Sequence, residues 1–221
     1  MTRGPWGRFF PGPSLRAAVL LKRGAEAEIH RTEFLGRAAV AKSRVPKGYR
    51  LPALDEELRR ARIRMETRLM AEARAAGVAV PVLYDIDLAK NEIIMEYVEG
   101  PTAKEVLEAG GPSAHRVAKE IGRTVGRLHR AGIVHGDLTT SNVIVRERRV
   151  LVIDFSLGGK DESVESRGVD LHLLREALTS AHARAASYYR DVLAGYREVA
   201  GAPAKDAIAK VKEIESRGRY T

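Results

Sequence analysis

The chain has 221 residues, a formal net charge of +9 at pH 7 and no cysteine. This length can bury a sizeable core, either in one large domain or in two small lobes. Without cysteine the chain forms neither disulfides nor thiolate metal sites, so any bound metal should be a hard ion held by oxygen. The positive charge favours binding to phosphate groups or to acidic protein surfaces.

No apolar run in the sequence approaches the roughly 20 residues that a transmembrane helix needs. Residues 1–14 carry three prolines and no continuous hydrophobic segment, which is unlike a signal peptide. We therefore expect a cytoplasmic protein without membrane association, and we read residues 1–14 as an irregular N-terminal tail.

The first half of the chain after this tail has the pattern of a small sheet and one long helix. Apolar runs flanked by charges predict strands, with turns near Gly24 and at Leu35-Gly36. The helix is indicated by helix-forming residues with apolar side chains at helical spacing, and Gly77 ends it. The predicted strands are residues 17–22, 37–44, 82–87 and 92–97, and the predicted helix is residues 54–76.

The second half is mainly helical. Glu99-Gly100-Pro101 interrupts the pattern and is typical of a linker between lobes. Beyond it we predict helices at residues 114–131, 169–179, 183–199 and 203–216, and a hairpin of residues 143–145 with 150–153. The predicted domains are an N-terminal lobe over residues 15–98 and a C-terminal lobe over residues 99–221 that ends in a basic tail.

The segment from His135 to Asn142, followed by Asp154 in Val152-Ile153-Asp154-Phe155, has the spacing of a kinase phosphotransfer site. Magnesium-assisted phosphoryl transfer needs a carboxylate beside the nucleophile and oxygen ligands for the metal. Asp137, Asn142 and Asp154 would supply these groups. Local turn chemistry explains an Asp and an Asn in one loop, but it does not predict the third residue. We expect His135 to be structural.

A lysine and a glutamate are the candidates for anchoring phosphates. Lys42 shares a strand face with Val40, and Ala39-Val40-Ala41-Lys42 is similar to the strand from which kinases present a lysine. Glu66 is the best acidic partner, because it lies on one helical stripe with Ile63, Met70 and Ala73 and should point inward. Glu56 and Glu57 remain the substitutes.

Three further segments occupy positions that suit nucleotide binding. Residues 22–28 stand where a loop would cover the phosphates, but Gly24 is the one glycine there, so the motif is weak. Residues 95–98 would form a hinge whose backbone bonds an adenine edge, with Glu96 and Val98 as the candidates. Asp170 either caps a helix or bonds the backbone of the catalytic loop, and both readings stay open.

From about residue 17 to residue 219, the chain resembles the small atypical kinase/ATPase subunit of the KEOPS (EKC) tRNA-modification complex, which is related to RIO kinases. The matching segments are Gly24-Ala25-Glu26-Ala27, Lys47-Gly48-Tyr49-Arg50, residues 64–68, His135 to Asn142, Gly168-Val169-Asp170-Leu171 and Arg217-Gly218-Arg219. The loop with Thr139-Thr140-Ser141 is the most specific of them.

This resemblance implies an α+β, protein-kinase-like fold with a strand-rich N-lobe and a reduced, helical C-lobe. It implies ATP and magnesium as cofactors, and autophosphorylation and ATPase activity, of the serine/threonine kinase class, that support threonylcarbamoyl transfer to tRNA. By position, Lys42 and Glu66 look like the phosphate-anchoring pair, Asp137 like the catalytic base, and Asn142 with Asp154 like metal ligands. The implied partners are tRNA, the threonylcarbamoyl-transferase subunit and a small regulatory subunit.

Three departures from ordinary kinases bear on the mechanism. Gly136 replaces an arginine that reads a phosphorylated activation loop, Thr139 replaces a lysine near the transferred phosphate, and Ser156 replaces the glycine after Asp154-Phe155. The segment after Asp154 is also short for a peptide-binding platform. We expect ATP hydrolysis or self-phosphorylation rather than general peptide phosphorylation. A phosphotransferase of the aminoglycoside or choline type and a vestigial nucleotide- and tRNA-binding scaffold remain alternatives.

Overall fold

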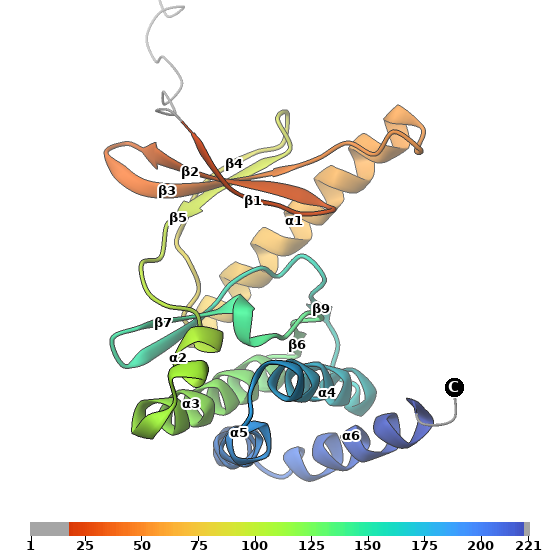
Figure 1. Cartoon of the computed structure of the whole chain (residues 1–221). Helices are drawn as coiled ribbons and strands as arrows, with labels where there is room; N and C mark the ends of the chain where they lie inside the picture. The colour runs from red at the N-terminus through yellow and green to blue at the C-terminus, as the bar shows by residue number, and fades with distance from the viewer. Residues whose placement is uncertain (1–17, 219–221) are drawn as a thin grey trace, which may run out of the picture. The chain divides into compact units, whose positions relative to one another are not determined.

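The structure is a computed structural model that describes residues 18–218 (Figure 1). The predicted tail at residues 1–14 and the last residues of the predicted basic tail lie outside this range. The described residues fall into two compact units, the first from residues 18–59 and 82–97 and the second from residues 60–81 and 98–218. The predicted lobe boundaries stay predictions, and this division places residues 60–81, with Glu66, in the second unit.

The first unit contains a five-stranded antiparallel sheet in the order β1-β2-β3-β5-β4. Its strands are β1 Val19–Arg23, β2 Ala27–Phe34, β3 Arg37–Arg44, β4 Leu83–Asp87 and β5 Glu92–Glu96. The predicted strands are confirmed, and β2 fills the interval between the two predicted turns. The central strand β3 carries Lys42 and is paired on both sides.

The predicted phosphate-covering loop is shorter than residues 22–28. Lys22 pairs with Ile29 and Arg23 pairs with Glu28, so the ladder of β1 and β2 extends into that segment. The loop is therefore a turn over residues 24–26. The Gly24 amide closes this turn by donating to the Ala27 carbonyl at 2.9 Å. The predicted bounds of this loop were wrong, because the pairing of β1 with β2 continues through the charged residues Lys22, Arg23 and Glu28.

The long helix α1, Pro52–Ala75, confirms the helix predicted over residues 54–76. Proline suits the first turn of a helix, and Asp55 in that turn complements the helix dipole. Past its end, Gly77 adopts a φ of +78°. The predicted inward stripe of Ile63, Glu66, Met70 and Ala73 is buried, with 1% exposure or less at each side chain.

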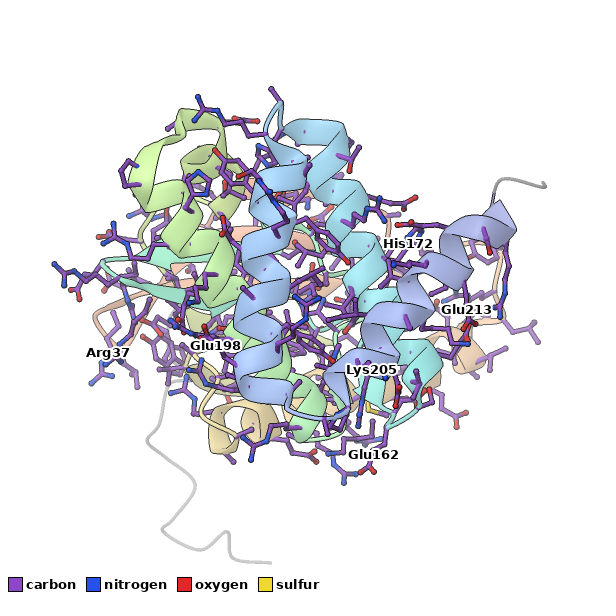
Figure 2. All side chains as sticks on the ribbon, turned by 90° about the horizontal axis from the view of Figure 1, so that it is seen from below. Arg37, Glu162, His172, Glu198, Lys205 and Glu213 are labelled. Carbon is purple, nitrogen blue, oxygen red and sulfur yellow. The ribbon has the colours of Figure 1, made fainter. Side chains whose placement is uncertain are left out.

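Helices dominate the second unit, and Figure 2 shows several of them side by side from below. Its helices are α2 Ala103–Ala109, α3 Gly111–Arg130, α4 Val164–Ala181, α5 Ala185–Ala200 and α6 Ala204–Gly218. Its short strands are β6 Ile133–Val134, β7 Val143–Arg146, β8 Arg149–Val152 and β9 Gly159–Lys160. The predicted hairpin is β7-β8, paired from Val143↔Val152 to Arg146↔Arg149.

Two helices differ from the sequence prediction. Helix α2 was missed, although Thr102 and Glu105 form a capping box at its start. Helix α4 begins at Val164 rather than at residue 169, because the side chain of Ser163 caps it by accepting from the Ser166 amide. Asp170 therefore lies inside α4. Within residues 18–218, no helix is long and apolar enough to span a bilayer.

Candidate functional site

The loop from His135 to Asn142 follows β6 and is held by one buried carboxylate. Asp170 accepts hydrogen bonds from the backbone amides of His135, at 2.7 Å, and Gly136, at 2.8 Å. Its side chain is 1% exposed. Of the two open readings of Asp170, the bond to the loop backbone is confirmed, and the helix cap is wrong because α4 begins six residues earlier.

Asp170 also joins the loop to two helices through His129. The imidazole lies between Asp170 Oδ2, at 3.2 Å, and Tyr196 Oη, at 2.9 Å. Burial acts to raise the pKa of Asp170, but the hydrogen bond and charge of His129 and the two loop amides outweigh it and lower that pKa from its ordinary value. Burial raises the pKa of Tyr196 to about 12, so its phenol stays protonated. Sequence reasoning missed both His129 and Tyr196.

His135 has the structural role that the sequence suggested. Its Nδ1 accepts from the Asp137 amide at 3.3 Å, and its Nε2 lies 3.1 Å from the carbonyl oxygen of Ile153. One partner is a donor and the other an acceptor, so the neutral ring carries its proton on Nε2. The ring also packs against Phe155, with the centroids 4.9 Å apart. His135 thus ties the catalytic loop to the strand that leads to Asp154.

Gly136, the residue in the place of an arginine, is required by the local geometry. Its φ is +76°, and a Cβ at this position would come within 2.1 Å of the carbonyl oxygen of Leu157. The segment after Asp154 therefore passes directly over the loop, and any side chain at residue 136 would push the two backbones apart.

Asp137 and Asn142 are in direct contact. The Asn142 side-chain nitrogen Nδ2 donates to the backbone carbonyl of Asp137 and to its carboxylate oxygen Oδ2, both at 2.9 Å. Because both partners are acceptors, the orientation of the amide is settled, and Oδ1 is the end of Asn142 that points away from them. The residues predicted to act on the nucleophile and on the metal therefore form one rigid pair.

The β7-β8 hairpin places Asp154 beside this pair. Val143 pairs with Val152, and the Ile153 amide donates to the Asn142 carbonyl at 2.9 Å. Asp154 itself has a φ of +66°, a conformation that costs a non-glycine residue energy and that is typical of functional sites.

A serine after Asp154 links it to helix α1. Ser156 bonds Asp154 Oδ1 through its hydroxyl, at 2.5 Å, and through its amide, at 3.3 Å. The same hydroxyl lies 3.4 Å from Glu66 Oε2. The second unit thus brings together Glu66, Asp137, Asn142 and Asp154. Of the three candidate glutamates, Glu66 is buried, Glu56 half-buried and Glu57 exposed.

Lys42, Gly24 and Glu96 lie in the first unit, and Val98 begins the last segment of the second. Lys42 is 4% exposed on β3, and its pairing with Glu66 stays a prediction. Gly24 lies in the exposed turn between β1 and β2. At the hinge, the amides of Glu96 and Tyr97 donate to the carbonyls of Val82 and Ala38, and the Glu96 carboxylate accepts from the Val82 amide at 3.1 Å. The roles of Glu96 and Val98 in adenine binding stay predictions.

The oxygen groups fit a magnesium ion that is shared with phosphates. Among residues 18–218, no group of three or more His, Cys, Asp or Glu side chains could hold a metal. Asn142 and Asp154 offer one amide oxygen and one carboxylate, and magnesium is usually held by one or two carboxylates together with substrate phosphates and water. These residues fit a metal that arrives with a nucleotide.

Comparisons with known proteins agree with this geometry. A family model described as RIO domain matches residues 28–160. The chain is 44% identical to the KEOPS complex subunit Bud32 of Pyrococcus abyssi, over 91% of this chain and 96% of that protein. It is 34% identical to the EKC/KEOPS complex subunit bud32 of Dictyostelium discoideum, over 91% of this chain and 82% of that protein.

Other relatives are longer. A probable bifunctional tRNA threonylcarbamoyladenosine biosynthesis protein of Methanothermobacter thermautotrophicus is 44% identical over 98% of this chain, which spans only 39% of that protein. Among solved structures, the Rio2 kinase-ADP/Mg²⁺-phosphoaspartate complex from Chaetomium thermophilum matches with a TM-score of 0.58 and 16% identity, over 92% of this chain and 72% of that chain. The latter likeness supports the kinase-like fold.

Proposed function

Because the chain belongs to the RIO-domain family and, within it, to the group of the KEOPS subunit Bud32, we propose that it is an ATP- and magnesium-dependent atypical kinase and ATPase. The observation that carries the proposal is the pair of Asp137 and Asn142, at 2.9 Å, with Asp154 two residues after strand β8. Nucleotide binding alone would not need a carboxylate set in this position.

Asp137 is the proposed base. Asn142 occupies its Oδ2, so Oδ1 would accept the proton of the attacking water or hydroxyl. The bonds from Asp170 and His135 fix the loop backbone, which keeps this oxygen in place. Bound magnesium would neutralise the phosphate charge that develops during transfer, and Asn142 Oδ1 and Asp154 would hold it.

The remaining site residues would bind the nucleotide. Lys42, held by Glu66, would neutralise the phosphates, Gly24 would lie over them, and Glu96 and Val98 would bond the adenine edge. At residue 136 other kinases have an arginine that binds a phosphorylated activation loop, and this chain has glycine. At residue 139 many have a lysine near the transferred phosphate, and this chain has threonine. Water, or a serine or threonine of the protein itself, is therefore the favoured acceptor.

The proposed biological role is support of threonylcarbamoyladenosine formation in cytoplasmic tRNA, within a KEOPS complex. The relatives' names support this role, and so does a net charge of +9, which suits a tRNA partner. The threonylcarbamoyl-transferase subunit and a small regulatory subunit are the proposed protein partners.

Release of labelled phosphate from ATP tests the activity. The wild-type chain and Asp137→Asn, which keeps the size of the side chain, would be compared with magnesium, with and without partner subunits and tRNA. We expect turnover that depends on Asp137, rises with the partners and falls at least about 100-fold in the variant. Turnover that is equal in both chains would contradict the role of Asp137.

Other outcomes would favour the alternative functions. Binding of ATP without any turnover that needs Asp137, under all conditions, would favour the scaffold. Saturable phosphate transfer to a small metabolite would favour the phosphotransferase reading.

A further inference from the structure

We propose that Ser156 is a positioning residue that orients the Asp154 carboxylate for metal binding, beside Glu66 of helix α1. This inference rests on the proposed function, because it concerns the metal site of that reaction. It is carried by the contacts of Ser156, whose hydroxyl lies 2.5 Å from Asp154 Oδ1 and 3.4 Å from Glu66 Oε2.

The two distances show where the hydroxyl proton lies. A serine hydroxyl has one proton, and a distance of 2.5 Å is typical of a strong hydrogen bond to a charged carboxylate. A separation of 3.4 Å is long for such a bond. Ser156 therefore donates to Asp154, and Glu66 is a second acceptor within reach of the same hydroxyl.

The backbone adds a second donor to the same oxygen. The Ser156 amide lies 3.3 Å from Asp154 Oδ1, so two groups of one residue hold Oδ1. These two donors fix the orientation of the carboxylate. Asp154 also has a φ of +66°, a conformation that costs a non-glycine residue energy.

A glycine at residue 156 would keep the amide but would lack the hydroxyl. Groups that orient a metal ligand typically change metal affinity about 10- to 100-fold when they are removed. Compared with a glycine, Ser156 has less backbone freedom but adds a hydrogen bond to Asp154. Its hydroxyl also lies near Glu66, 90 positions away in the sequence. The expected signature is weaker metal binding with nucleotide binding preserved.

Manganese binding measures this effect without relying on turnover. Mn²⁺ would be titrated into the chain with saturating ADP, and free Mn²⁺ read by its electron paramagnetic resonance signal. We expect Ser156→Ala to weaken Mn²⁺ binding about tenfold and Ser156→Thr, which retains the hydroxyl, to bind nearly as the wild type does. ADP binding without metal should be equal in all of these chains.

The controls separate positioning from folding. Ser216→Ala removes a hydroxyl from α6 that bonds its own helix backbone at Glu213, and it should bind Mn²⁺ as the wild type does. Thermal unfolding checks each variant. If Ser156→Ala does not fold, Ser156→Cys keeps the volume with a poor donor, and it should show the same weakening.

Two results would overturn the inference, and only the second would also overturn the proposed function. Equal Mn²⁺ affinity in the wild-type chain and the folded Ser156→Ala or Ser156→Cys variant would remove the role of Ser156 and leave the proposed function intact. Failure of the wild-type chain with ADP to bind Mn²⁺ would remove the metal site, and the proposed function would fall with the inference.

Discussion

Asp170 and Gly136 both shape the loop from His135 to Asn142: Asp170 accepts hydrogen bonds from it, and Gly136 leaves room for a neighbouring backbone. The carboxylate of Asp170 satisfies two loop amides that would otherwise be buried without partners, which is a costly state for a polar group. Gly136 lets the carbonyl of Leu157 approach the loop backbone. Neither residue needs to touch a substrate, yet together they set the position of Asp137.

Replacing Gly136 with alanine should destabilise the protein and lower ATP turnover. The new Cβ would meet the Leu157 carbonyl at 2.1 Å in a backbone with a φ of +76°. We expect the free energy of unfolding to fall by at least about 2 kcal/mol. Denaturant titration measures this loss.

Gly36→Ala is the matched control for that variant. Gly36 has the same φ of +76°, but no atom lies within 4 Å of the position that a Cβ would take, so only backbone strain of about 1 kcal/mol should appear. Equal losses in the two variants would show that the approach of Leu157 contributes nothing.

At the scale of elements, α3 and α5 of the second unit pack closely against each other. Gly122 of α3 faces the Val192 carbonyl, and Gly195 of α5 faces the Lys119 carbonyl. The two helices therefore meet through their backbones at small residues, which brings His129 on α3 near Tyr196 on α5, with the rings 5.4 Å apart. The pairing of these helices supports the network around Asp170.

Gly122→Ala tests this close approach. Helix propensity alone predicts a gain of about 1 kcal/mol when alanine replaces glycine inside a helix. Here the Cβ would lie 1.9 Å from the Val192 carbonyl oxygen, so we expect a net loss of about 2 kcal/mol in the free energy of unfolding. A gain measured by chemical denaturation would contradict the packing of α3 against α5.

At the scale of the whole molecule, the net charge of +9 is the feature that bears on partners. Proteins that neutralise phosphates release counterions from the nucleic acid, so their affinity falls as salt rises. A chain with this charge should attract tRNA over some distance and without reading its bases.

Filter binding of tRNA at increasing salt tests this electrostatic contribution. We expect the affinity to fall at least about tenfold between about 50 and 200 mM salt. The logarithm of the binding constant should fall linearly with the logarithm of salt concentration. An affinity that does not change with salt would rule out charge as the basis of the interaction.

The sequence by itself determined strands β1, β3, β4 and β5, the β7-β8 hairpin and the long helices, and it picked out the candidate set of Asp137, Asn142 and Asp154. These features are local, because alternation, helical spacing and a loop-plus-hairpin motif depend on residues near one another in the chain. The stripe that buries Glu66 is also periodic, and so it was predictable. The start of α4 was wrong, because a serine cap decided it.

Only the tertiary structure decided what holds these residues in place. Asp170 reaches the His135 amide across 35 positions, Tyr196 reaches His129 across 67, and Ser156 reaches Glu66 across 90. Such partners leave no periodic signal, because packing of distant segments selects them and a buried polar group is stable only once it has found its partner. The candidate reactive residues could therefore be predicted from the sequence, whereas the contacts that support them were set by the fold.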